Sequence, residues 1–142
     1  MNAPLYNATI LRLAATIPFA ERLAAPDATS EKRSPICGSR VTVDIKLGED
    51  DRVAAIGLRV NACALGQASA NLMASHAIGR SADELESARD ALAGWLAGER
   101  AAPGDWPGLE VLAPAISHSA RHASIRLAFE AAAEAARQAG QG

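Results

Sequence analysis

The feature that most constrains the fold is a pair of short segments in which apolar and other residues alternate, separated by an acidic turn. The apolar residues of the two segments are Val41, Val43, Ile45 and Leu47, followed by Ile56, Leu58 and Val60. A period of two predicts strands that bury one face. Residues 48–51 between them are a glycine and three acidic residues, which favour a turn. The sequence therefore predicts an antiparallel hairpin.

Helical spacing is found on both sides of this hairpin. We expect helices over residues 6–17, 66–79, 81–98 and 121–139. Ser81, with Glu84 three positions later, forms a capping-box pattern at the start of the third of these helices. Residues 25–35 and 101–119 have the composition of extended or ordered connections. The predicted fold class is α+β: a small antiparallel β-sheet, made of the hairpin plus a possible third strand, packed against several α-helices in a single domain over residues 1–142.

Composition and charge narrow the class of protein. The formal net charge of −2 leaves no basic footprint, which disfavours nucleic acid and anionic lipid as partners. No segment approaches the roughly 20 unbroken apolar residues of a membrane helix, and residues 1–10 contain no basic residue that would begin a secretory signal. We therefore expect a cytoplasmic protein, in which reducing conditions make its two cysteines free thiols or metal ligands rather than a disulfide.

The two cysteines flank the hairpin. Cys37 precedes the first strand and Cys63 follows the second, so pairing across the hairpin should place them opposite each other at one edge of the sheet. Gly38 leaves the first thiol unshielded, and the start of the following helix favours the thiolate form of Cys63. A free cysteine is also commonly a small buried hydrophobic residue. Two cysteines that converge at irregular junctions nevertheless favour a metal or sulfur-transfer site.

Three motifs occur in order around these cysteines. They are Pro35-Ile36-Cys37-Gly38, then Ala62-Cys63-Ala64-Leu65-Gly66-Gln67-Ala68-Ser69-Ala70-Asn71-Leu72-Met73, and then Gly79-Arg80-Ser81. Together they resemble the U-type iron-sulfur cluster scaffold family, which includes IscU, SufU and the N-terminal domain of NifU, over about residues 35–96. The resemblance implies the fold predicted above and a protein that is not an enzyme but holds iron or a 2Fe-2S cluster, with zinc as a further possibility. It also implies a cysteine desulfurase as sulfur donor and apo-proteins as recipients.

The chain departs from the family pattern at two ligand positions. Members of the family hold their metal with three cysteines and an aspartate. Ser39 stands where the aspartate is expected, and Ser124 stands where the third cysteine is expected. Because serine is a poor ligand for zinc or iron, the resemblance implies a divergent member with an incomplete ligand set.

A histidine could replace one of the missing ligands. His122 precedes Ser124 by two residues and His118 lies one helical turn earlier, so Cys37, Cys63, His122 and Ser124 are the candidate metal ligands. Either histidine could instead be a solvated residue at a helix start. Arg121 is a further candidate, because a guanidinium near the thiols would stabilise a thiolate, although it too could be an ordinary surface residue.

Three functions compete on this reading. The leading hypothesis is a scaffold or sulfur acceptor that holds iron or a nascent cluster between Cys37 and Cys63. The alternative is a degenerate scaffold paralogue that binds zinc or a partner without assembling clusters. The third is a thiol enzyme that uses Cys63 as nucleophile and His122 as base. The thiol enzyme ranks last because the sequence shows no carboxylate to orient the histidine and no oxyanion site. The sequence leaves the oligomeric state open.

Overall fold

The computed structural model of the chain describes residues 5–35 and 37–141, so Ile36 of the first cysteine motif lies outside the described residues. The elements are α1 (Ala8–Ala15), β1 (Ala28–Arg33), β2 (Arg40–Leu47), β3 (Val53–Asn61), α2 (Ala64–Ala77), α3 (Ala82–Leu96), the 3-10 helices η1 (Leu109–Ala115) and η2 (Ser119–Arg121), and α4 (His122–Gln141). The strands form one antiparallel sheet in the order β1-β2-β3. The predicted α+β class is confirmed.

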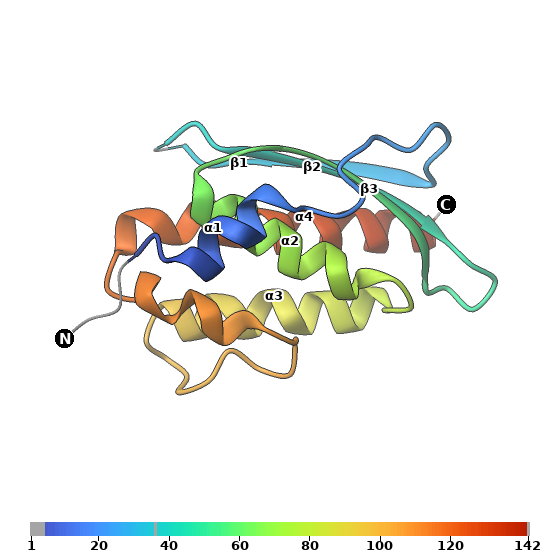
Figure 1. Cartoon of the computed structure of the whole chain (residues 1–142). Coiled ribbons are helices and arrows are strands. Elements are labelled where there is room, and N and C mark those ends of the chain that lie inside the picture. The colour runs from blue at the N-terminus through green and yellow to red at the C-terminus, as the bar shows by residue number, and fades with distance from the viewer. Residues whose placement is uncertain (1–4, 36, 142) are drawn as a thin grey trace.

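The sheet forms one layer of the molecule and the helices lie on one side of it (Figure 1). Helix α4 packs against β1 and β2, α2 packs against α4, and α3 lies against α4 on the side away from the sheet. The inner face of the hairpin supplies apolar pairs to this core: Val41 with Val60, Val43 with Leu58, and Ile45 with Ile56. Each such side chain contributes about 1.5–3 kcal/mol when it is fully buried.

The first strand is polar, which is why the sequence indicated only a connection with a possible third strand. Ser30 is buried on β1, and its hydroxyl donates to the carboxylate of Glu134 on α4. Lys32 forms an ion pair of 3.1 Å with the same carboxylate. Polar contacts with α4 therefore replace the apolar alternation that would have marked this strand.

A bulge near the turn shifts the pairing of β2 with β3 from the pairing that the sequence predicted. Lys46 pairs with Ala55 whereas Leu47 pairs with Val53, so Ala54 is an extra residue on β3. The pairing also ends at Arg40 and Asn61, before either cysteine is reached. The prediction that Cys37 and Cys63 face each other directly across the ladder was therefore wrong, because a bulge leaves no mark in the apolar pattern.

Residues 19–23, which we call the strap, cover the outer face and the free edge of the sheet. The backbone N–H of Leu58 donates to the carbonyls of Phe19 and Glu21 at 3.0 and 3.2 Å. A Cβ on Gly57 would come within 2.4 Å of the Glu21 carbonyl oxygen, so only glycine fits beneath the strap.

The strap is held by one buried carboxylate. Asp44 on β2 is fully buried and accepts two hydrogen bonds from Arg22, at 2.7 and 3.0 Å. It also accepts from the Leu23 backbone N–H at 2.9 Å and from the Thr29 hydroxyl at 2.6 Å. Burial alone would raise the pKa of Asp44, but the hydrogen bonds from Arg22, Thr29 and Leu23 outweigh burial and hold that pKa below its usual value.

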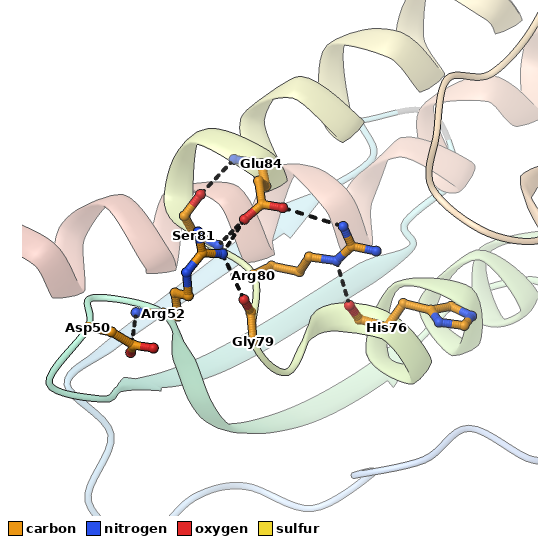
Figure 2. Close-up of polar contacts among 7 residues, drawn as sticks. All are labelled: Asp50, Arg52, His76, Gly79, Arg80, Ser81 and Glu84. Carbon is orange, nitrogen blue, oxygen red and sulfur yellow. Dashed lines mark hydrogen bonds and ion pairs between the residues drawn. The ribbon is translucent and has the colours of Figure 1, made fainter.

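The turn end of the hairpin is tied to the junction between α2 and α3 (Figure 2). Gly79 adopts a left-handed conformation with φ of 88°, which ends α2 at little steric cost. Arg52 donates to the Gly79 carbonyl at 3.0 Å and to the Glu84 carboxylate. Ser81 and Glu84 form the predicted capping box at the start of α3.

Arg80, in the junction between α2 and α3, packs against an aromatic ring. The Arg80 guanidinium lies 4.7 Å from the centre of the Trp106 ring and donates to the His76 carbonyl at 3.1 Å. The indole N–H of Trp106 donates to the Leu72 carbonyl at 2.8 Å. Gly79, Arg80 and Ser81 thus each support the junction, and none of them lies among the residues that surround the cysteines.

Replacing Asp44 by asparagine should destabilise the fold. The change removes a buried charge that receives two hydrogen bonds from a guanidinium, so the free energy of unfolding is expected to fall by about 2 to 4 kcal/mol. Because the pKa of Asp44 is lowered in the folded state, its contribution is complete above the ordinary aspartate value of 3.8 and is lost as the pH falls through the lower folded value.

Urea unfolding at neutral and acidic pH measures this effect. The exposed Asp105→Asn is the matched control, since it changes the net charge equally and removes no hydrogen bond within the described chain. Equal stabilities for the two variants would contradict the role given to Asp44.

Candidate functional site

Cys37 lies between β1 and β2, and we call the described residues of this connection, 34, 35 and 37–39, the loop. The loop is closed by hydrogen bonds from the Ser34 N–H to the Ser39 carbonyl at 2.8 Å and from the Gly38 N–H to the Ser34 carbonyl at 3.3 Å. Gly38 has a φ of 73°, a conformation that glycine adopts readily. A Cβ added at Gly38 would meet nothing within 4 Å, and Cys37 itself is exposed. The first thiol is therefore open to a partner.

Cys63 is the residue that precedes the first turn of α2. Its backbone is extended and its side chain makes no capping hydrogen bond with the helix. The half-buried thiol instead lies 3.4 Å from the Ser124 hydroxyl at the start of α4. Sequence reasoning placed this sulfur beside the free amides of α2, whereas its observed polar contact is with α4.

Two serines link the two thiols. The Cys37 sulfur lies 3.1 Å from the Ser39 hydroxyl, and the Ser124 hydroxyl donates to Ser39 at 3.0 Å. Ser39 and Ser124 are 5% and 1% exposed, so the link between the thiols is shielded from water. We call Cys37, Ser39, Cys63 and Ser124 the cysteine-serine cluster. It unites the loop, the start of α2 and the start of α4, which are far apart in the sequence.

The cluster depends on a close contact between α2 and α4. A Cβ on Gly66 would lie 2.6 Å from the Ser124 hydroxyl oxygen and 2.8 Å from the Ala62 Cβ. One turn later, the Ser69 hydroxyl donates to the Ile125 carbonyl at 2.6 Å. Sequence reasoning missed the role of Gly66 and Ser69, although two small residues three positions apart in a helix are a recognisable sign of close packing.

The environment of Cys37 favours its thiolate. Hydrogen bonds from the Ser34 hydroxyl, and then from the hydroxyl and backbone N–H of Ser39, lower the pKa of Cys37 to about 7 against the opposing effect of burial. A larger share of this thiol than of an ordinary one is therefore thiolate at neutral pH, the form that attacks sulfur and binds metal. Ser34 was not identified from the sequence, because its position relative to the thiol depends on the conformation of the loop.

His122 is positioned away from this cluster. Its Nε2 lies 3.0 Å from the carbonyl oxygens of Ala115 and Ile116, at the end of η1. Among the described residues, Cys63 and Ser124 bond to each other, whereas His122 bonds to these carbonyls and to neither thiol. His118 is exposed, and the side chain of Arg121 makes no hydrogen bond or ion pair with the described residues.

The donors present do not fit a resident structural metal. In residues 5–35 and 37–141, no group of three or more histidine, cysteine, aspartate or glutamate side chains could hold an ion. The cluster offers two thiols and two hydroxyls, whereas a structural zinc takes four nitrogen or sulfur ligands. In the same residues, no buried side-chain nitrogen or oxygen lacks a hydrogen-bond partner. The role of His122 and Ser124 as metal ligands stays a prediction.

Comparison with known proteins identifies related chains. The family model of the NifU-like N-terminal domain matches residues 18–121. A crystal structure of a NifU-like protein (N-terminal) from Brucella abortus is 40% identical, with a TM-score of 0.90 and coverage of 96% of this chain and 95% of that chain. A scaffold protein for the SUF system from Fervidobacterium islandicum AW-1 is 17% identical with a TM-score of 0.85, covers 93% and 96% of the two chains, and supports the fold alone. No curated protein matches the chain.

The helices also bear on membrane association. None of those in the described part of the chain combines the length and the apolar character that a membrane crossing requires.

Replacing Gly66 by alanine should destabilise the protein, although glycine to alanine usually stabilises the interior of a helix. The added methyl group would press on Ser124 and Ala62, with an expected loss of about 1 to 3 kcal/mol in the free energy of unfolding. Gly94→Ala in α3 is the matched control, because its Cβ would meet the flexible side chains of Arg100 and Glu99. There we expect a gain of up to about 1 kcal/mol. Thermal unfolding of both variants tests whether the stability falls in Gly66→Ala and rises in Gly94→Ala.

Alkylation of Cys37 should follow the titration of a thiol with a pKa near 7. Ser34→Ala removes the strongest of the stabilising hydrogen bonds and should raise the pKa of Cys37, so labelling at neutral pH should slow about fivefold for a rise of about one unit. Iodoacetamide labelling over a pH series, with the modified cysteine identified by mass spectrometry, measures this. Ser119→Ala, at an exposed hydroxyl, is the control, and an unchanged profile for Ser34→Ala would count against the assigned cause.

Proposed function

The chain belongs to the family of NifU-like N-terminal domains, and from this premise we propose that it is an iron-sulfur cluster assembly scaffold that holds iron or a nascent cluster between Cys37 and Cys63. The observation that carries the proposal is the cysteine-serine cluster, which joins both thiols through contacts of 3.0 to 3.4 Å. Two thiols at the ends of one chain of three such contacts, one of them exposed, are suited to receive a soft metal ion and sulfide.

Iron and sulfide are cargo in this proposal rather than a resident cofactor. The chain supplies two strong ligands, and ligand positions without protein sulfur are left for exchange with solvent or with another protein. A cluster bound in this way is released more readily than one held by four cysteines. The incomplete ligand set therefore favours transfer over storage.

The partners follow from the same chemistry. A cysteine desulfurase would supply sulfur, and the exposed Cys37 on its open loop is accessible to a donor protein. Apo-proteins with free thiolates would take the finished cluster. We propose that this exchange takes place in the cytoplasm, where reducing conditions keep both cysteines free.

One observation favours the alternative of a degenerate paralogue. Two of the positions at which the family resemblance places metal ligands carry the hydroxyls of Ser39 and Ser124, and these hydroxyls bond to each other. A partner-binding protein without cluster assembly would retain the fold and tolerate such a change. Loading with iron and sulfide separates the two functions.

Cys63→Ser should abolish cluster uptake, because a serine hydroxyl is a poor ligand for iron. The measurement is anaerobic reconstitution with ferrous iron and sulfide, followed by visible absorption, in which sulfur-to-iron charge transfer reports a cluster. Wild-type protein is expected to gain this absorption and Cys63→Ser to lack it, with Ser119→Ala as the control for handling. A wild-type chain without charge-transfer absorption would support the paralogue instead.

A further inference from the structure

The cysteine-serine cluster occupies every position at which the family resemblance places a metal ligand. Those positions are 37 and 39 on the loop, 63 before α2 and 124 at the start of α4. The polar contacts pass through them in one unbroken chain, from Cys37 to Ser39 to Ser124 to Cys63. A metal ion bound at these positions would join the loop, α2 and α4. The two serine hydroxyls join the same three segments by hydrogen bonds.

The polar atoms of the cluster are satisfied without an ion. A buried metal site that has lost its ion leaves ligand atoms without partners, and such atoms are rare in stable folds. Here the hydroxyls of Ser39 and Ser124 are buried and bonded, and no buried side-chain nitrogen or oxygen of the described residues is unpaired. The site is therefore complete as a hydrogen-bonded structure.

The surrounding backbone reinforces the same junction. Gly66 brings α2 against Ser124, and the Ser69 hydroxyl bonds to the Ile125 carbonyl. On the loop, the Ser34 N–H bonds to the Ser39 carbonyl and sets the position of the Ser39 side chain. These contacts fix both serines from opposite sides.

We propose that Ser39 and Ser124 are positioning residues that take the place of a structural metal ion, so that the loop, α2 and α4 are joined by a hydroxyl pair and the two thiols are prearranged in metal-free protein. The fold around the site then does not depend on metal. Cargo is loaded onto a site that already exists and leaves without unfolding it.

The test is thermal unfolding of the full chain with EDTA and with added zinc. The wild-type chain should be folded and unfold cooperatively with EDTA, and zinc, which can bind the two thiols, should raise its melting temperature by less than it raises that of the double variant described below. Ser124→Ala leaves Ser39 without its donor and should lower the melting temperature by several degrees, equally with EDTA and with zinc. Ser119→Ala, which removes an exposed hydroxyl at the same end of the molecule, should leave it unchanged.

A double variant should make the melting temperature depend on metal. Ser39→Asp with Ser124→Cys replaces the hydroxyl pair by the ligand types that the family resemblance implies. Without metal it should melt below wild type, because the new carboxylate loses its hydroxyl donor, and zinc should raise its melting temperature by several degrees. A wild-type chain that is unfolded with EDTA and folds only when zinc is added would overturn the proposal.

A folded Ser124→Ala variant with unchanged melting temperature would overturn the proposal as well. If Ser124→Ala fails to fold, the wild-type measurement and Ser39→Ala still test the proposal. Ser39→Ala is expected to show the same fall in melting temperature with and without metal. The proposal does not depend on cluster assembly. Absent cluster uptake with a metal-independent fold would remove only the proposed function, whereas cluster uptake with a metal-dependent fold would remove only this inference.

Discussion

The close approach of α2 to α4 is the contact on which the site depends. It is possible because Gly66 has no side chain, and it places the Ser124 hydroxyl between the two thiols. The rest of the fold holds this contact in place. Helix α4 packs against β1 and β2, and the strap and the Arg52 contacts hold the sheet at its outer face and at its turn end. Rigidity at both ends of the sheet keeps the loop of Cys37 in register with α4.

The hydroxyls at two of the positions that the family resemblance assigns to ligands change the chemistry of the site. The family resemblance places a carboxylate and a thiol where Ser39 and Ser124 stand, and serine is close to cysteine in size. Two of the donors are therefore neutral and weakly coordinating. Of the two sulfurs, one is exposed and one is half buried. Under the proposed function this pair would bind soft ions with less affinity than four ligands would.

The sequence was informative where local chemistry decides the structure. Alternating apolar residues revealed the hairpin, and Ser81 with Glu84 revealed the start of α3. The polar strand β1 was less visible, because its buried Ser30 is satisfied by Glu134, 104 residues later. The bond between Ser39 and Ser124, 85 residues apart, depends on how α4 packs and has no local signature. For the same reason the expected link from His122 to the thiols was not found, since nearby carbonyls at the end of η1 accept its hydrogen bond.

The strap has a consequence for how other proteins can approach. A sheet with a bare edge can accept a strand from another chain, which serves recognition but also promotes aggregation. Here the edge of β3 is already bonded to the backbone at Phe19 and Glu21, and the opposite edge carries the charged residues Glu31, Lys32 and Arg33. Pairing with a further strand is therefore blocked at Leu58 on one edge and opposed by charge on the other.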